Sequence, residues 1–168
     1  FNEINTIEKI LNQIDQVDFI PKEIILVDDS STDGTKSLIE NHLANKVTKV
    51  IYHKNNKGKG SAIKSAQKFI KGDYVIIQDA DLEYDPKDYE KILEPFKLGV
   101  ADVVYGSRFI GSEKKRVLYF CHTVGNKFLT LFSNIFTNLN LTDMEVGYKA
   151  FKTSILKDIN LRENRFGF

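Results

Sequence analysis

The chain has 168 residues, of which 42% are hydrophobic and 28% are charged, so a single domain with a full core is expected over residues 1–168. Its formal net charge of +1 gives no sign of a polyanion-binding surface and does not favour a nucleic-acid partner. One cysteine, Cys121, excludes an internal disulfide and fits a reducing compartment. We expect no signal peptide and no membrane span, because no apolar run approaches ~18 residues.

Strand and helix patterns alternate along the chain. Apolar residues recur at helical spacing over residues 4–18, and further helices are predicted over 32–43, 61–70 and 85–98. Strands are predicted between them, at residues 23–28, 48–52, 73–78 and 101–106. This alternation predicts an α/β fold with a mostly parallel sheet and helices on both faces.

The sequence changes character after Gly106. Lys114, Lys115 and Arg116 form a basic cluster, and residues 128–141 carry no charge while mixing aliphatic and aromatic residues with Thr, Ser and Asn. The pattern predicts a long aromatic helix behind a basic turn. Two interpretations remain open: a core helix beside a solvated loop, or an interfacial segment resting on an anionic membrane surface.

Two aspartates one residue apart follow the strand at 73–78. In an extended backbone, side chains at i and i+2 point the same way, so Asp79 and Asp81 would present two carboxylates to one small volume. A hard divalent cation relieves their repulsion, with water and a phosphorylated ligand completing its shell. The pattern indicates nucleotide-diphosphate chemistry; a polar turn after a buried strand is the alternative.

A second acidic pair, Asp28 and Asp29, ends the strand at 23–28. In open α/β sheets, ligands bind outside the carboxyl ends of the strands. We therefore expect both acidic clusters to line one crevice.

A receiver-type phospho-accepting signalling module is the competing class. Asp28 and Asp29 would then bind Mg²⁺, and Asp79 would accept a phosphoryl group. That interpretation expects a lysine at a later strand end, which the sequence does not match, and it leaves Asp81 and Glu83 without a role.

A loop rich in glycine and lysine occupies residues 55–60. It matches neither the phosphate-binding P-loop nor the dinucleotide-binding glycine pattern. Its plain role is a turn before a helix, although its glycines would also let the backbone approach a ligand.

Taken together, six short motifs resemble family 2 glycosyltransferases, and within them the dolichyl-phosphate mannosyltransferases and their bacterial polyprenyl-phosphate relatives. The motifs occupy residues 1–3, 27–35, 56–60, 79–83, 106–109 and 142–149. The resemblance implies a GT-A (Rossmann-like) nucleotide-diphospho-sugar transferase fold. It also implies inverting transfer of one hexose from GDP-mannose or a UDP-hexose to a polyprenyl or dolichyl phosphate, at the cytoplasmic face of a membrane. Against the family pattern, the first strand and the C-terminal end are expected to be missing.

The resemblance also implies how the nucleotide is held. Phe1, which replaces the family's usual tyrosine, and Glu3 would touch the nucleotide. Val27 and Asp29 would contact the base and ribose, with Asp28 as their neighbour.

The remaining implied roles concern the sugar diphosphate and the metal. Asp79, Ala80 and Asp81 would line the diphosphate, and Arg108 would meet phosphate. Asp81 and Glu83, beside Asp79, would hold Mg²⁺ or Mn²⁺, which would neutralise the charge that develops on the departing diphosphate.

The need for a catalytic base depends on the acceptor. A phosphate monoester has a second pKa of about 6 and attacks without a base at neutral pH. A sugar hydroxyl would need one, and Asp143 or Glu145 is then the candidate. The alternative for this pair is a cap or salt bridge in a loop.

Overall fold

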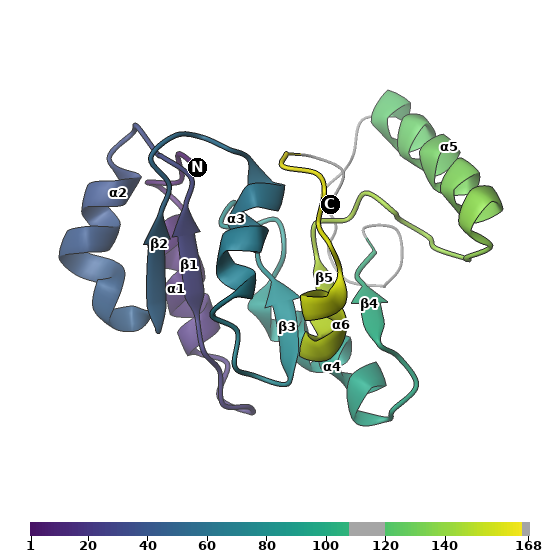
Figure 1. The fold of residues 1–168 in the computed structure, drawn as a ribbon, viewed down its shortest axis with the longest axis horizontal. Coiled ribbons are helices and arrows are strands. Elements are labelled where there is room, and N and C mark those ends of the chain that lie inside the picture. The colour runs from purple at the N-terminus through teal and green to yellow at the C-terminus, as the bar shows by residue number, and fades with distance from the viewer. Residues whose placement is uncertain (108–119, 166–168) are drawn as a thin grey trace.

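The structure is a computed structural model that describes residues 1–107 and 120–165 (Figure 1). In these residues the α-helices are α1 (Ile7–Asp15), α2 (Thr35–Leu38), α3 (Lys59–Gln67), α4 (Tyr89–Lys97), α5 (Phe120–Thr137) and α6 (Thr153–Asp158). The strands are β1 (Ile25–Asp28), β2 (Lys49–Tyr52), β3 (Tyr74–Ile77), β4 (Val103–Tyr105) and β5 (Lys149–Lys152). A π-helical turn at Ile39–Leu43 and a 3-10 turn at Ala44–Lys46 prolong α2, and a 3-10 turn at Pro86–Asp88 leads into α4.

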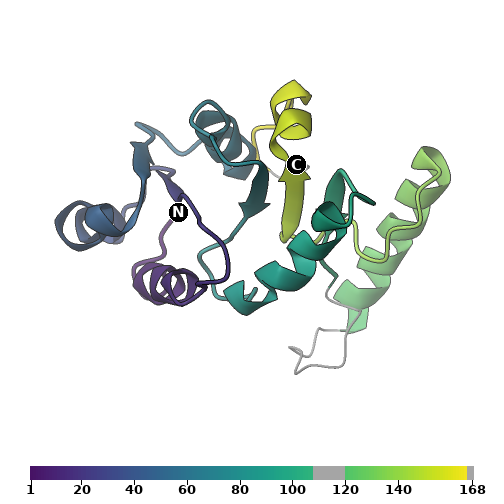
Figure 2. The same cartoon turned by 90° about the horizontal axis from the view of Figure 1, so that it is seen from below.

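The strands form one layer with helices on both sides. β1 and β2 pair in parallel, and β5 lies between β3 and β4, antiparallel to both. Seen from below, α1 and α4 cover one face and α3 and α6 the other (Figure 2). The expected α/β architecture is confirmed. β5 was not expected, because a four-residue strand that begins and ends with lysine shows no clear apolar alternation.

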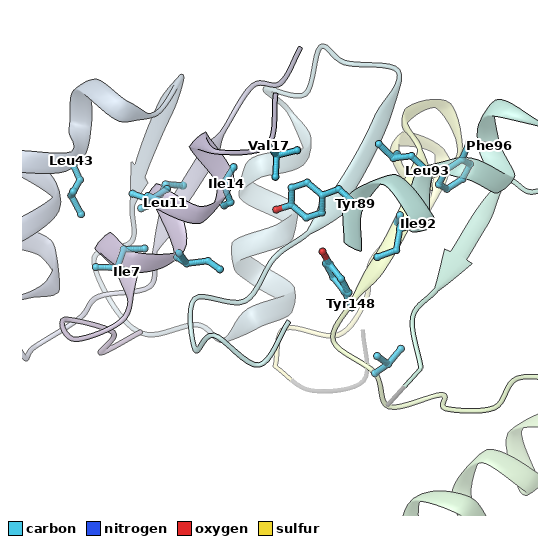
Figure 3. Packing of buried hydrophobic residues seen from close by; sticks show 14 of the residues in the cluster. Ile7, Leu11, Ile14, Val17, Leu43, Tyr89, Ile92, Leu93, Phe96 and Tyr148 are labelled. Carbon is cyan, nitrogen blue, oxygen red and sulfur yellow. The ribbon is translucent and has the colours of Figure 1, made fainter. Parts of the chain in front are cut away.

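The main core lies between the strand layer and the helices α1 and α4 that cover one of its faces (Figure 3). Ile7, Ile10, Leu11 and Ile14 recur at helical spacing and form the buried stripe of α1. In α4 the corresponding apolar residues are Tyr89, Ile92, Leu93 and Phe96. Each such side chain contributes about 1.5–3 kcal/mol when fully buried. This core fixes the strands whose carboxyl ends carry the acidic pairs.

Helix α5 stands apart at the β4 edge of the molecule (Figures 1 and 2). Its buried residues are polar, Asn126 and Thr130, whereas Phe120 and Phe136 are each 81% exposed. The predicted long aromatic helix is present, and it ends at Thr137, within the uncharged stretch 128–141. The core-helix interpretation is therefore wrong for α5. No helix in the described part of the chain is long and apolar enough to cross a membrane.

Candidate active site

The loop at residues 56–60 joins the two acidic strand ends. The Gly58 backbone N–H donates to Asp29 Oδ2 at 2.7 Å. The next residue, Lys59, places its Nζ 2.6 Å from Asp79 Oδ2. The two acidic strand ends therefore lie on either side of one loop, as expected of neighbouring clusters. That they line one ligand crevice stays a prediction.

Residues at the start of the chain are bonded to the loop after β1. The backbone N–H groups of Asn2 and Glu3 donate to Ser31 Oγ and Thr35 Oγ1, each at 2.9 Å. Phe1 is 55% exposed beside them. The first two motifs of the sequence therefore meet in space, as a common nucleotide site requires.

The predicted nucleotide residues at the end of β1 differ in exposure. Val27 is half-buried, whereas Asp28 and Asp29 are 3% and 5% exposed. The Asp28 carboxylate accepts hydrogen bonds from the backbone and hydroxyl of Ser31. Asp28 thus holds the loop after β1, whereas the Asp29 carboxylate accepts from the Lys57 and Gly58 backbone in the loop after β2. Whether either aspartate contacts a nucleotide stays a prediction.

Backbone strain occurs next to both acidic pairs. Ser30 and Leu82 have φ angles of 68° and 63°. A non-glycine residue in this region is uncommon, and for a residue as bulky as leucine it costs free energy. Such strain concentrates at functional sites, which supports the assignment of these strand ends as a ligand site.

The carboxylates predicted to hold a metal have different surroundings. Asp79 is half-buried and paired with Lys59, whereas Asp81 and Glu83 are exposed. Asp81 Oδ1 accepts the Glu83 backbone N–H at 3.0 Å. Among residues 1–107 and 120–165, no three His, Cys, Asp or Glu side chains gather as a metal cluster. Exposed carboxylates do suit Mg²⁺ or Mn²⁺, which take one or two of them plus phosphate and water.

Ala80 lies between the two aspartates and is half-buried. Its side chain packs against the main hydrophobic core. It therefore anchors this turn, while its predicted contact with the sugar diphosphate stays a prediction.

Lys149 adds a second cation that the sequence-based site did not include. It is only 6% exposed, and its Nζ lies 4.9 Å from the Tyr105 ring centroid. Burial lowers the pKa of this ammonium, as does Lys59, while Asp143 and Asp79 act in the opposite direction. Its place in the motif at 142–149 was the available signal, but its burial depends on the unexpected strand β5.

Gly147 closes the site over the ion pair. A Cβ atom at this position would lie 2.5 Å from Asp79 Oδ2 and 3.2 Å from Lys59 Nζ. The Gly147 backbone N–H donates to the Tyr84 hydroxyl at 3.0 Å. Only glycine allows this close approach.

Asp143 and Glu145, the candidate bases, share one partner on α5. The Asn126 side-chain amide lies 3.1 Å from Asp143 Oδ1 and 3.0 Å from Glu145 Oε2. Asp143 is 1% exposed. The two residues do come together, and Asn126 is a site residue that the sequence did not indicate.

A segment near the C-terminus covers the start of α3. The backbone N–H groups of Gly60 and Ser61 donate to the carbonyl oxygens of Arg165 and Asn164, at 3.3 Å and 2.9 Å. A Cβ on Gly58 would lie 2.7 Å from the Asn164 oxygen, so the glycine permits this contact. No sequence signal indicated this pairing between residues about a hundred positions apart.

Two predictions from the sequence lie outside the described residues. They are the predicted phosphate contact of Arg108 and the basic cluster Lys114, Lys115 and Arg116.

Solved structures with a similar fold include glucosyl-3-phosphoglycerate synthases. One of them, from Mycobacterium tuberculosis in complex with Mn²⁺, uridine-diphosphate and glucosyl-3-phosphoglycerate, superposes with a TM-score of 0.68 at 20% sequence identity. The superposition covers 92% of this chain and 55% of that one. The expected GT-A fold is confirmed.

Sequence comparisons agree with the structural one. Glycosyltransferase AglJ from Haloferax volcanii is 29% identical over 99% of this chain and 52% of its own length. A dolichol-phosphate mannosyltransferase from Pyrococcus furiosus is 32% identical over 68% of this chain and 32% of its own. The chain thus spans about half or less of these relatives. The family model described as Glycosyl transferase family 2 matches residues 1–159, so the chain belongs to that family and not to the receiver modules.

Proposed function

We propose that this protein transfers one hexose, with inversion, from a nucleoside-diphosphate sugar to a polyprenyl phosphate. The observation that carries the proposal is the Lys59–Asp79 pair, which the loop at 56–60 joins to the end of β1. The name of the Pyrococcus furiosus relative supports a lipid phosphate acceptor, and the uridine-diphosphate complex of the structural neighbour supports a nucleotide donor.

The donor diphosphate needs positive charge around it. Lys59 and Lys149 supply two ammonium groups beside Asp79, one of them buried where its field is weakly screened. Asp81 and Glu83 are the residues that would hold Mg²⁺ or Mn²⁺, and the metal would neutralise charge on the leaving diphosphate. Arg108 is proposed to add a phosphate contact.

The acceptor phosphate can act as the nucleophile itself. As its oxygen bonds to the anomeric carbon, the bond from that carbon to the donor phosphate breaks, and the nucleoside diphosphate leaves with the electron pair. Because the monoester is largely dianionic at neutral pH, no proton has to be removed. Asp143 and Glu145, both bonded to Asn126, would be needed as bases only for a hydroxyl acceptor.

A polyprenyl phosphate presents its headgroup at a membrane surface. The outward face of α5 carries large apolar side chains that are 44–81% exposed, namely Phe120, Val124, Phe128, Leu129, Leu131, Phe132, Ile135 and Phe136. A helix with such a face binds at the headgroup level of a bilayer. Lys114, Lys115 and Arg116 would each add about 1 kcal/mol of attraction to anionic lipids. The exposed apolar face supports our proposal that the protein acts as a peripheral protein, at the cytoplasmic face of a membrane.

The test is to incubate the full-length protein with Mg²⁺ or Mn²⁺, a polyprenyl phosphate and a panel of nucleotide sugars. The expected result is a lipid-linked hexose phosphate, detected by mass, with one preferred donor. Transfer only to a water-soluble acceptor would contradict the lipid assignment. Labelling of the protein by a small phosphodonor, with no use of nucleotide sugars, would contradict the proposal as a whole.

A further inference from the structure

A buried polar chain runs from the end of β1 to the middle of α3. His53, which directly follows β2, has its Nδ1 atom 2.6 Å from Asp29 Oδ1 and its Nε2 atom 2.8 Å from Ser65 Oγ. The His53 and Asp29 side chains are 6% and 8% exposed. The proposed transfer chemistry gives His53 no task.

The Asp29 carboxylate, at one end of these hydrogen bonds, also holds the glycine and lysine loop at residues 55–60. The Lys57 backbone N–H lies 2.9 Å and 3.1 Å from the two Asp29 carboxylate oxygens, and the Gly58 N–H lies 2.7 Å from Oδ2. Burial by itself would raise the pKa of the Asp29 carboxyl, but hydrogen bonds from the Lys57 backbone and from His53 outweigh it and lower that pKa. The carboxylate is therefore held as an anion by several donors at once.

The orientation of this carboxylate decides where the loop sits. A carboxylate with backbone donors alone can rotate about its terminal bond, because that torsion is broad. His53 removes this freedom, since Nδ1–H donates to Asp29 while Ser65 engages the other ring nitrogen and fixes the ring on α3.

We infer that His53 is a positioning residue for the donor site: it fixes the Asp29 carboxylate, which fixes the Lys57 and Gly58 backbone and so brings Lys59 to Asp79. Lys59 follows Gly58 directly, and its Nζ lies 2.6 Å from Asp79 Oδ2. A loop held in this way presents the ammonium group at a fixed place, which lowers the cost of organising the site when the diphosphate binds. The effect on the donor rests on the proposed function, whereas the effect on the loop does not.

The test compares His53→Ala with His42→Ala, a change at an exposed histidine of the π-helical turn. Hydrogen-exchange mass spectrometry of the full-length protein should show about tenfold faster exchange at residues 54–60 in His53→Ala, the size expected when a hydrogen bond to a charged group is lost. Exchange in α4 should not change, and His42→Ala should behave as wild type. The KM for the nucleotide sugar should rise about tenfold as well, with the KM for the acceptor unchanged.

Two further variants separate positioning from general support of the fold. His53→Asn places an amide nitrogen where Nδ1 lies, so it should restore slow exchange at 54–60 and most of the donor KM. Ser65→Ala frees the other end of the ring and should give an intermediate effect. Unchanged exchange at 54–60 in His53→Ala, an equal rise in α4, or a rise in the acceptor KM would overturn the inference. If the wild-type protein transferred no sugar, the proposed function would fail, but the exchange data would still decide the role of His53.

Discussion

The end of β1 and helix α5 differ in an unusual way from an ordinary protein surface: the first buries charged side chains, and the second exposes apolar ones. At the end of β1 the carboxylates of Asp28 and Asp29 are buried and hydrogen-bonded, Asp28 to the loop after β1 and Asp29 to the loop at 56–60. In α5 the buried side chains are Asn126 and Thr130, and aromatic residues face outward. Burying a charge is costly unless hydrogen bonds compensate it, and a contiguous exposed apolar face marks an interaction surface. Under the proposed function, the first region would be organised in advance for a charged ligand, and the apolar face of the second would rest on a membrane surface.

The largest effect should come from a single methyl group in the site. Gly147→Ala would push a Cβ to within 2.5 Å of Asp79 Oδ2 and displace the Lys59–Asp79 pair. We expect kcat/KM for transfer to fall about a hundredfold, as misplacement of about 1 Å can cause.

Gly125→Ala is the matched control on α5. A Cβ there meets nothing within 4 Å, so activity should persist and the free energy of unfolding should rise by about 0.5–1 kcal/mol. Equal activity of the two variants would show that the contact over Asp79 is unimportant.

Asn126 tests how the polar face of α5 is attached to the segment that carries Asp143 and Glu145. Asn126→Leu removes the amide hydrogen bonds to Asp143 and Glu145, so the buried Asp143 carboxylate has one hydrogen-bond donor fewer. The free energy of unfolding in urea should fall by about 1–3 kcal/mol. Lys127→Gln, at the exposed neighbouring position, should have little effect. An unchanged urea midpoint in Asn126→Leu would mean that the polar face of α5 does not stabilise its attachment.

Asp81 tests whether the acidic end of β3 uses a metal. Asp81→Asn keeps the shape and the acceptor for the Glu83 backbone but removes the charge. Metal-dependent affinity for the nucleotide sugar should weaken about tenfold, or about 1.4 kcal/mol. Calorimetric titration with and without chelator measures it, and affinities that do not depend on chelator in either protein would contradict a metal role.

The smallest effect should come from one side chain on the outer face of α5. Phe136 is 81% exposed, and Phe136→Ser should weaken binding to anionic vesicles by about fivefold, because about 1 kcal/mol of partial apolar burial is lost. Phe19→Ser, at an exposed phenylalanine far from α5 in sequence, is the control. Equal losses in the two variants would mean that α5 is not the membrane-binding face.

Local patterns predicted much of this molecule. The spacing of Ile7, Ile10, Leu11 and Ile14 predicted α1, and apolar runs that end in aspartates predicted β1 and β3. The order of six motifs then led to the family and to most candidate residues. These features are local in sequence, because helical and strand periodicity depends only on neighbouring residues.

Contacts between distant residues were decided by the tertiary structure. The insertion of β5 between β3 and β4 buries Lys149, and the docking of α5 turns Asn126 toward Asp143. His53 looks like a polar residue after a strand until the packing of α3 brings Ser65 to its ring. The free energy of such a contact depends on what surrounds it, since a buried charge or amide is stable only with its partners in place. The sequence by itself therefore determined the family and the candidate site residues, and only the folded chain decided which side chains hold the others in position.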